Sequence, residues 1–325
     1  MSQPKLFITR RLPTQLEQLQ QVATVEVWTE RQPPPYEVLL EKVKAIDGLV
    51  CLLTDPIDRQ LIEAATSLKV ISQMAVGYDN IDIPAATARH IPVGHTPGVL
   101  TDATADFTWA LLMAAARRVV EADRFTRALQ WRTWEPDLLL GPNIAGATLG
   151  IVGFGRIGQA VARRAKGFEM RILYMSRHRC DPELEESLGV EFVAFDRLLC
   201  ESDFVTIHTP LSDDTYHLFS DREFEMMKPS AILINTARGA IVDPDGLYRA
   251  LSSGQIAGAA LDVTEPEPIG MDSPLLRLDN LIIAPHIGSA SSQTREKMAN
   301  MAIENLMVGL KGDRLPYCVN PEVYG

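Results

Sequence analysis

Polar side chains that could do chemistry together follow three buried apolar runs in the second half of the chain. Arg238 comes after the run AILI, Glu265 and Glu267 come after AGAA, and His286 comes after LIIA. Ligands of an open parallel α/β sheet bind at the carboxyl ends of its strands, so these side chains would share one site. A guanidinium can bind a carboxylate and polarise a carbonyl group, and a histidine can donate a proton near neutral pH. A neighbouring carboxylate would keep that histidine protonated and oriented. Any one of these residues alone is compatible with a structural role, but together they indicate reduction of a 2-oxo acid.

A phosphate-binding turn precedes this set. The pattern G-x-G-x-x-G follows the apolar run LGIV and precedes the helical pattern IGQAVARRAKGF. In this setting the first glycine allows a tight turn, the second lets the backbone approach a pyrophosphate, and the third lets the helix pack on the strand. The helix N-terminus adds N–H groups and the positive end of a dipole. We therefore predict a dinucleotide site whose turn consists of Gly153, Phe154, Gly155, Arg156, Ile157 and Gly158.

The residues after the next strand favour NADPH over NADH. A site for NAD places Asp or Glu about twenty residues beyond the glycine motif, where it binds the ribose hydroxyls. Here the strand RILYM is followed by Ser176, which stands 18 residues after Gly158, and then by Arg177 and Arg179. A small hydroxyl beside a guanidinium suits a ribose 2′-phosphate, because the guanidinium can form two hydrogen bonds to phosphate oxygens. NADPH is therefore the predicted cofactor, with NADH as the alternative.

The elements that must position these residues alternate between strands and helices. Over the first hundred residues, apolar runs such as KLFI and GLVCLL alternate with helical patterns such as EVLLEKVKAI. This order favours an α/β fold with a parallel sheet. Residues 101–129 carry one long helical pattern, a second strand–helix alternation begins at ATLGIVGFG, and residues 291–312 are again helical.

Length and charge exclude several classes of protein. The 325 residues suggest two domains, at ~100–200 residues each. With 31 Lys and Arg against 42 Asp and Glu, the net charge of −11 argues against nucleic-acid and anionic-lipid partners. The four cysteines have no C-x-x-C spacing, so we expect neither a metal site nor disulfides, but reduced, buried thiols. The first ten residues resemble a strand rather than a signal peptide, and no apolar stretch is long enough for a membrane helix, so we expect a cytoplasmic protein.

The motifs together resemble the signature set of the D-isomer-specific 2-hydroxyacid dehydrogenases. The resemblance spans nearly the whole chain and rests on VGYDNID, GFGRIG, NTARG, LDVTEPEP and PHIGSA. Within that family, TPGVLTDATAD, ARRVVEAD and RILYMSR are most similar to the glyoxylate/hydroxypyruvate reductase branch. The resemblance implies two Rossmann-like domains: a cofactor domain, residues 101–287, inserted into a flavodoxin-like substrate domain, residues 1–100 and 288–325. It also implies an active site in the cleft between the domains and a homodimer, with Trp131 and Trp134 in the core or, more in keeping with the family, at the dimer interface.

The resemblance also implies roles for individual residues. Arg238 would bind and polarise the substrate, and His286 would be the general acid. The family places its glutamate five residues after the aspartate, and counting from Asp262 selects Glu267 rather than Glu265. The other histidines lack this paired context and are expected to be structural or exposed, with His208 near the cofactor. The predicted substrate contacts are the backbone N–H groups of Val76 and Gly77, with Leu53, Leu100, Trp134, Arg238 and Ser289. Further predicted cofactor contacts are Thr209, Pro210, Thr236, Ala237, Asp262, His286 and Gly288.

These roles predict NADPH-dependent reduction of glyoxylate or hydroxypyruvate to glycolate or D-glycerate. Two alternatives stay open at this point. Related dehydrogenases that act on 3-phosphoglycerate, formate or phosphite share the fold. A non-catalytic, NAD(H)-sensing scaffold of the corepressor type can retain the same residues, and a turnover assay distinguishes it from an enzyme.

Overall fold

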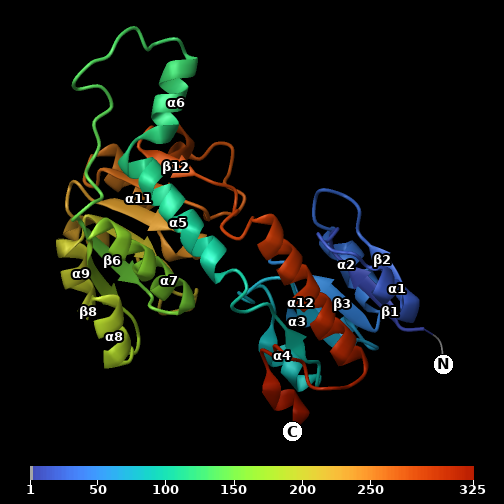
Figure 1. Ribbon diagram of the computed structural model, residues 1–325. Helices are drawn as coiled ribbons and strands as arrows, with labels where there is room; N and C mark the ends of the chain where they lie inside the picture. Colours follow the sequence, from blue (N-terminus) through green and yellow to red (C-terminus); the bar gives the residue numbers. More distant parts are fainter. Residues whose placement is uncertain (1–2) are drawn as a thin grey trace. The chain divides into compact units, whose positions relative to one another are not determined.

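The computed structural model describes residues 3–325, which form two compact units (Figure 1). One unit comprises residues 3–100 and 290–325, and the other comprises residues 101–289. The chain thus leaves the first unit after Leu100 and re-enters it after Ser289, where the sequence suggested a return at residue 288.

The first unit is built on a five-stranded parallel sheet. Its strand order, β2-β1-β3-β4-β5, is that of flavodoxin-like sheets. The strands are β1 (Lys5–Ile8), β2 (Thr24–Val27), β3 (Gly48–Cys51), β4 (Val70–Gln73) and β5 (Val93–Gly94). The helices are α1 (Glu17–Val22), α2 (Tyr36–Val43), α3 (Arg59–Ala64), α4 (Ile83–Ala88), α12 (Ser292–Leu310) and a short 3-10 helix, η4 (Pro321–Tyr324).

Alternate residues of the strands enter two apolar layers, one on each face of this sheet. Phe7 of β1 packs with residues of α2, α3 and α4, whereas its neighbours Leu6 and Ile8 pack with α1 and α12. Although α12 comes at the end of the chain, its Ala302 and Leu306 are fully buried in the second layer. Figure 1 shows α12, in red, beside the blue strands of the same unit.

The second unit is built on a seven-stranded parallel sheet with the order β12-β11-β10-β9-β6-β7-β8. The strands are β6 (Thr148–Val152), β7 (Arg171–Met175), β8 (Val190–Phe192), β9 (Phe204–Ile207), β10 (Ile232–Asn235), β11 (Gly258–Leu261) and β12 (Leu281–Ile283). The α-helices are α5 (Thr101–Ala116), α6 (Val119–Arg127), α7 (Arg156–Ala165), α8 (Pro182–Leu188), α9 (Phe195–Glu201), α10 (Asp221–Met226) and α11 (Pro244–Ser252). Three 3-10 helices complete the unit: η1 (Lys166–Phe168), η2 (Gly239–Ile241) and η3 (Pro274–Arg277).

The order of these strands reverses at β6. The chain runs outward from β6 through β7 to β8 and then returns to the other side of β6 as β9. Val152, the last residue of β6, is accordingly paired with Met175 on one side and Ile207 on the other. Such a reversal leaves a crevice at the carboxyl ends of the strands, which is where ligands of open α/β sheets bind. The two parallel sheets confirm the predicted fold class.

One prediction about local structure was wrong, and one strand was not predicted. The helical pattern over residues 101–129 forms two helices, because Arg118 adopts the left-handed conformation, with φ 50°, between α5 and α6. The short strand β8 was not anticipated, since three residues are too few for a recognisable alternation.

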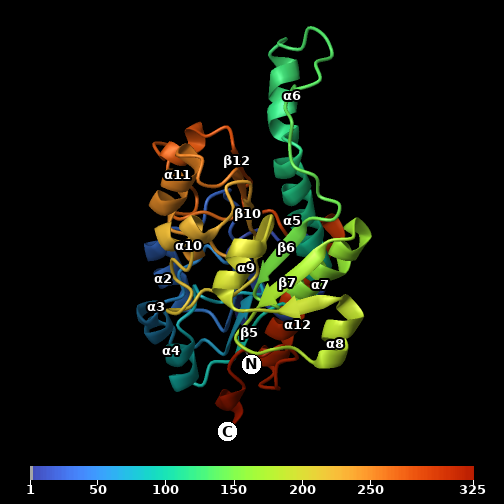
Figure 2. The same ribbon diagram turned by 90° about the vertical axis from the view of Figure 1, so that its left-hand side faces the viewer.

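The structure excludes one alternative about burial and contradicts one prediction. In the loop after α6, Trp131 and Trp134 are 61% and 79% exposed, so neither belongs to a core, and a place at a dimer interface stays a prediction. Figure 2 shows α6 and this loop projecting from the sheet of their own unit. The prediction of buried thiols was wrong: of the four cysteines, only Cys51 is buried, and Cys200 is exposed.

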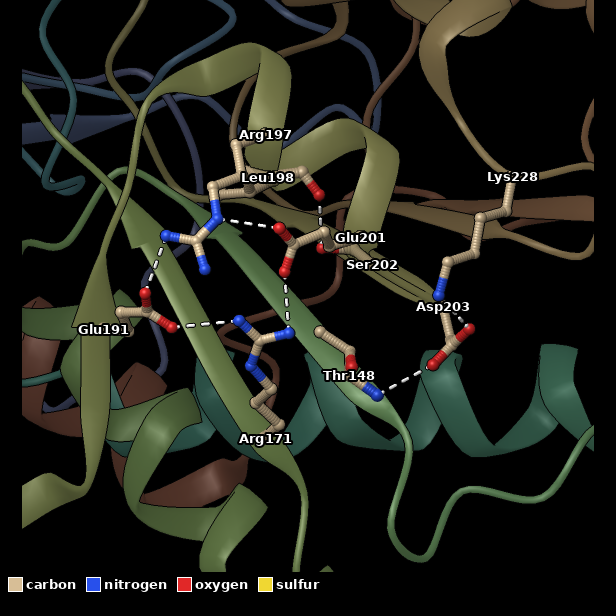
Figure 3. A network of polar contacts seen from close by, with 9 residues as sticks. All are labelled: Thr148, Arg171, Glu191, Arg197, Leu198, Glu201, Ser202, Asp203 and Lys228. Atoms are coloured by element: carbon tan, nitrogen blue, oxygen red, sulfur yellow. Dashed lines mark hydrogen bonds and ion pairs between the residues drawn. The ribbon is translucent and has the colours of Figure 1, made fainter.

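Four charged residues form a closed ring at the amino ends of β7 and β8 (Figure 3). Arg171 contacts Glu191 at 3.0 Å and Glu201 at 2.7 Å, and Arg197 contacts the same two carboxylates, each at 2.7 Å. The ring joins β7, β8 and α9 at the edge of the sheet opposite the switch point.

Within residues 3–325, no helix has the length and apolar character needed to cross a bilayer.

Candidate active site

The glycine turn lies at the switch point of the seven-stranded sheet. Gly153 has φ 95°, a conformation that favours glycine, and its N–H donates to the Met175 carbonyl at 2.8 Å. A Cβ atom at Gly153 would lie 2.5 Å from the Thr209 nitrogen and 2.6 Å from the His208 carbonyl carbon. A Cβ atom at Gly158 would lie 2.3 Å from the Gly153 oxygen. The first and third glycines are therefore required by the close packing of β6, β9 and α7.

The second glycine faces open space instead. Gly155 is the N-cap of α7, no side chain caps the helix, and a Cβ atom there would meet no described atom within 4 Å. The first N–H groups of a helix have no acceptor within the helix, so this end can bind an anion. Phe154 is buried and stacks on Tyr174 with 4.0 Å between ring centroids, which leaves only its backbone for a ligand. An uncapped helix end with open space at its glycine fits the pyrophosphate of a dinucleotide.

The three residues predicted to select NADPH differ in their contacts. Arg179 donates to both carboxylate oxygens of Glu185, at 2.8 and 2.7 Å. Hydrogen bonds from Arg179 and Tyr174 hold the pKa of Glu185 at about 2, so this carboxylate stays charged and keeps the arginine. The Ser176 hydroxyl donates to a backbone carbonyl in its own turn. Arg177 is exposed, and its guanidinium has no hydrogen bond or ion pair with residues 3–325. Of the two arginines, Arg177 is therefore the one available to a phosphate.

A buried asparagine fixes the turn that carries Arg238. Asn235 ends β10; its Nδ2 donates to the Arg238 carbonyl at 2.8 Å, and its Oδ1 accepts the Ala237 N–H at 3.0 Å. The Thr236 hydroxyl lies 2.9 Å from the Thr108 hydroxyl of α5. Arg238 is half-buried, and its Nη1 donates to the Ala237 carbonyl at 2.8 Å. Hydrogen bonds thus fix the backbone at Ala237 and Arg238 and the side chain of Thr236, the segment that carries the guanidinium.

Asp262 fixes the loop that carries the histidine. Its two carboxylate oxygens accept the N–H groups of Ile287 and Gly288, both at 2.7 Å, and its carbonyl accepts the His286 N–H at 2.8 Å. Burial raises the pKa of Asp262, an effect that the two N–H donors oppose. A Cβ atom at Gly288 would lie 2.9 Å from the carboxylate, so only glycine allows this approach. Asp262 therefore supports the histidine loop through its backbone, a contact that the sequence pattern did not reveal.

His286 and Glu267 form a direct pair. Nδ1 of His286 lies 2.5 Å from Oε1 of Glu267, and the two side chains are 24% and 33% exposed. His286 has φ 55°, so it adopts the left-handed backbone conformation in the loop that Asp262 holds. Because Nδ1 is engaged by the carboxylate, Nε2 is the nitrogen that can exchange a proton with a ligand.

The expectation that no other histidine has such a partner was wrong. His217 Nε2 lies 2.6 Å from Oε2 of Glu265, so the second Glu-Pro pair has its own histidine. His208 has no such partner: both ring nitrogens are buried without a hydrogen bond to the described residues. Burial lowers the pKa of His208 to about 3, which keeps the ring neutral.

In the first unit, the loop after β4 presents two backbone N–H groups. The Val76 carbonyl accepts a hydrogen bond from His95 Nδ1 at 3.0 Å, and the Gly77 carbonyl accepts one from Gln73 Nε2 at 3.3 Å. The N–H groups of Val76 and Gly77 have no acceptor among residues 3–325. Gln73 also donates to Asn80, whose amide donates to the carbonyls at positions 52 and 55, so the loops after β3 and β4 are joined. Sequence reasoning missed this amide network, because nothing in the spacing pairs Gln73 with Asn80.

The structure gathers the predicted residues of the second unit at one edge of its sheet. They follow successive strands: the glycine turn after β6, Ser176 and Arg177 after β7, Thr209 and Pro210 after β9, Thr236, Ala237 and Arg238 after β10, Asp262 after β11, and His286, Gly288 and Ser289 after β12. Arg179 follows β7 like Ser176 and Arg177, but its guanidinium is hydrogen-bonded to Glu185. Leu53 and Leu100 belong to the first unit and are partly buried there.

Comparison with known proteins gives consistent matches. Residues 109–288 match the family model described as D-isomer specific 2-hydroxyacid dehydrogenase, NAD binding domain. The glyoxylate reductase of Korarchaeum cryptofilum (strain OPF8) is 53% identical over 322 residues, which cover 98% of this chain and 97% of that protein. The structure of the TT0316 protein from Thermus thermophilus superposes with a TM-score of 0.91 at 46% identity, covering 97% of this chain and 99% of that chain. The NADPH-dependent glyoxylate/hydroxypyruvate reductase of Sinorhizobium meliloti, in complex with NADP and malonate, gives a TM-score of 0.86 at 28% identity, covering 99% and 98%.

Proposed function

Because the chain belongs to the D-isomer specific 2-hydroxyacid dehydrogenase family, we propose that it reduces glyoxylate or hydroxypyruvate with NADPH, giving glycolate or D-glycerate. The observation that carries the proposal is the His286–Glu267 pair, 2.5 Å apart, at the edge of the sheet that also bears the glycine turn. The name of the Korarchaeum cryptofilum relative, glyoxylate reductase, supports the substrate.

The glycine turn is the proposed cofactor site. The N–H groups at the start of α7 and the open space at Gly155 suit a pyrophosphate. A nicotinamide dinucleotide bound there supplies the hydride for C2 of the 2-oxo acid. Preference for NADPH rests on two residues. Arg177 is exposed and has no hydrogen bond or ion pair with the described residues. Ser176 stands where an NAD site has a carboxylate, which would repel a phosphate. The NADPH dependence named for the Sinorhizobium meliloti relative supports this choice.

His286 is the proposed general acid. Its Nε2 donates a proton to the carbonyl oxygen of the substrate as C2 accepts the hydride, which yields the 2-hydroxy acid. Glu267 orients the ring through Nδ1 and stabilises the positive charge that the ring carries before it donates. General acid catalysis of this kind contributes about 10²–10⁴-fold to a rate.

The substrate carboxylate is the proposed ligand of Arg238 and of the Val76 and Gly77 N–H groups. A guanidinium can bind a carboxylate with two hydrogen bonds, and backbone N–H groups without an acceptor are suited to an anion. Leu53, Leu100 and Ser289 are proposed to contribute to the walls that limit the size of the substrate.

A homodimer is part of the same proposal. Exposed apolar side chains gather on α6 and the loop after it, among them Val119, Leu129, Trp131, Trp134 and Leu140. Large exposed apolar patches mark interaction surfaces. A cytoplasmic location stays a prediction from the sequence.

Steady-state kinetics tests the proposal. The enzyme is assayed with NADPH and with NADH against glyoxylate, hydroxypyruvate, pyruvate and phosphohydroxypyruvate. We expect the highest kcat/KM with NADPH and either glyoxylate or hydroxypyruvate. Equal or better efficiency with NADH would contradict the role of Arg177, and absence of turnover with every acid would identify a non-catalytic scaffold.

The variant His286→Ala tests the general acid separately. Turnover should be abolished, while the affinity for NADPH, measured by fluorescence titration, stays close to that of the wild type. Near-normal turnover in this variant would overturn the assignment of His286.

A further inference from the structure

Two histidine–glutamate pairs share one short loop of the second unit. The loop contains Glu265-Pro266 and Glu267-Pro268 in succession. Glu267 contacts His286, as described above, whereas Glu265 contacts His217, which follows β9 and its loop, with 2.6 Å between Oε2 and Nε2. Neighbouring glutamates are thus directed to histidines from two different parts of the chain.

His217 is itself attached to the turn that follows Arg238. Its N–H donates to the Ala240 carbonyl at 2.8 Å, and the Phe219 N–H donates to the Ile241 carbonyl at 3.0 Å. His217 has φ 48°, and the ring of Tyr216 stacks on its imidazole with 4.0 Å between centroids. The histidine is therefore held by its backbone and by its neighbour, and only Nε2 extends to the glutamate loop.

The glutamate loop and the Arg238 turn also touch through their backbones. A Cβ atom at Gly239 would lie 2.0 Å from the Thr264 oxygen and 2.8 Å from the Glu265 nitrogen, so no other residue allows this approach. The Thr264 hydroxyl donates to the Pro266 carbonyl at 2.8 Å, which closes the loop on itself. Three segments therefore meet at one place: the one with His217, the one with Arg238 and the one with both glutamates.

We propose that His217 and Glu265 are positioning residues for the reaction, because their pair fixes the loop that carries Glu267 against the turn that carries Arg238. The inference rests on the proposed function, in which Arg238 binds the substrate carboxylate and Glu267 orients the general acid. Backbone contact at Gly239 brings the two segments together at one point. The charge-assisted hydrogen bond between His217 and Glu265 attaches the loop at a second point.

The pair lies beside the reacting groups without being one of them. Both side chains are about one third exposed, at 30% for His217 and 32% for Glu265. Since Oε2 of Glu265 faces His217, this carboxylate is not the partner of His286. The effect of Glu265 on the reaction is therefore exerted through the positions of Arg238 and Glu267.

The variants His217→Gln and Glu265→Gln test this inference in the full-length enzyme. Glu265→Gln removes the charge of the carboxylate, and His217→Gln replaces the imidazole by a neutral amide. Each variant keeps a polar side chain at its position. We expect KM for the 2-oxo acid to rise about tenfold, the effect of losing one charge-assisted hydrogen bond, with the dissociation constant for NADPH unchanged. The double variant should resemble the worse single variant within about threefold, because the two residues act as one unit.

A matched control is available in the first unit. His90 also has positive φ, at 54°, and is exposed there. His90→Gln makes the same substitution in the same backbone conformation, and KM should not change. Glu265→Ala, compared with Glu265→Gln, shows whether a remaining hydrogen bond partly restores KM.

The outcomes separate the inference from the proposed function. If the wild type reduces none of the 2-oxo acids, the proposed function fails. If the wild type turns over and the variants lose stability at unchanged KM, the pair is merely structural and the inference is wrong. A rise in KM with retained NADPH binding and non-additive effects supports it.

Discussion

Substituting alanine for two glycines of the same turn should separate folding from cofactor binding. Gly153 has φ 95°, and a Cβ atom there would come within 2.5–2.7 Å of the backbone at His208 and Thr209. Gly155 has no described atom within 4 Å of its Cβ position. The same added methyl group thus meets backbone at one position and open space two residues later.

The cost of Gly153→Ala follows from these contacts. A left-handed backbone costs a residue with a side chain roughly 1–2 kcal/mol, and forcing a methyl group into filled space costs typically about 1–3 kcal/mol. Together these terms lower the free energy of unfolding of the second unit by about 2–5 kcal/mol. At roughly 2–4 °C per kcal/mol for a domain of this size, Tm falls by about 5–20 °C.

Gly155→Ala should leave stability unchanged. Alanine is a poorer N-cap than glycine by up to about 1 kcal/mol, and restricting the unfolded chain returns about 0.4–1 kcal/mol, so the two effects offset each other. The methyl group would stand where a pyrophosphate approaches the helix, so the dissociation constant for NADPH should rise at least about tenfold.

Thermal unfolding followed by circular dichroism and NADPH titration followed by fluorescence measure the two effects. The reasoning fails if Gly155→Ala melts as early as Gly153→Ala, because the two positions would then be equally confined. It also fails if Gly155→Ala binds NADPH like the wild type, because the turn would then not be the pyrophosphate site.

Three further predictions concern charged groups. Glu267→Gln keeps a hydrogen bond to His286 but loses the charge, so kcat in steady-state assays should fall about 10–100-fold; an unchanged kcat would exclude the pair from catalysis. Hydrogen bonds from Arg179 and Tyr174 hold the pKa of Glu185 at about 2, below the ordinary value of 4.5. The stabilisation that the charged Glu185 gives the folded state is therefore complete above about pH 4.5 and is lost as the pH falls toward 2. Glu185→Gln should therefore lose less stability than the wild type between these pH values in urea unfolding, and an equal loss would contradict the assignment. Arg197→Ala opens the charged ring, and Tm should fall by no more than about 3 °C because the ring is exposed; a larger fall would show that the ring contributes more than surface ion pairs do.

The sequence predicted the elements that repeat a pattern and the residues that stand at strand ends. Strand–helix alternation was enough to give two parallel sheets, and the glycine spacing was enough to locate the turn at Gly153. The break at Arg118 could not be predicted, because the residues on both sides of it favour a helix and only the backbone conformation of one residue separates α5 from α6.

Contacts between side chains that are far apart in the chain could not be predicted from the sequence. The resemblance to the family, which places its glutamate five residues after the aspartate, selected Glu267 over Glu265, and the contact with His286 agrees with that choice. The partner of Glu265 is His217, 48 residues earlier in the chain, and no local pattern connects them. Similarly, the sequence favoured two arginines for the 2′-phosphate, but Glu185 lies on the next helix and binds one of them, Arg179.

The place of α12 in the first unit has a consequence for the order in which the protein can fold during synthesis. Leu6, Val50 and Val70 form one face of the first sheet, and Met298, Ala302 and Leu306 of α12 cover that face. The ribosome makes those strands first and the helix last, with residues 101–289 in between. The second unit is continuous in the chain and can complete its core while the first sheet still lacks its cover. The first unit is thus completed only after the second, and a nascent chain stalled before residue 290 exposes an apolar sheet face to chaperones and to aggregation.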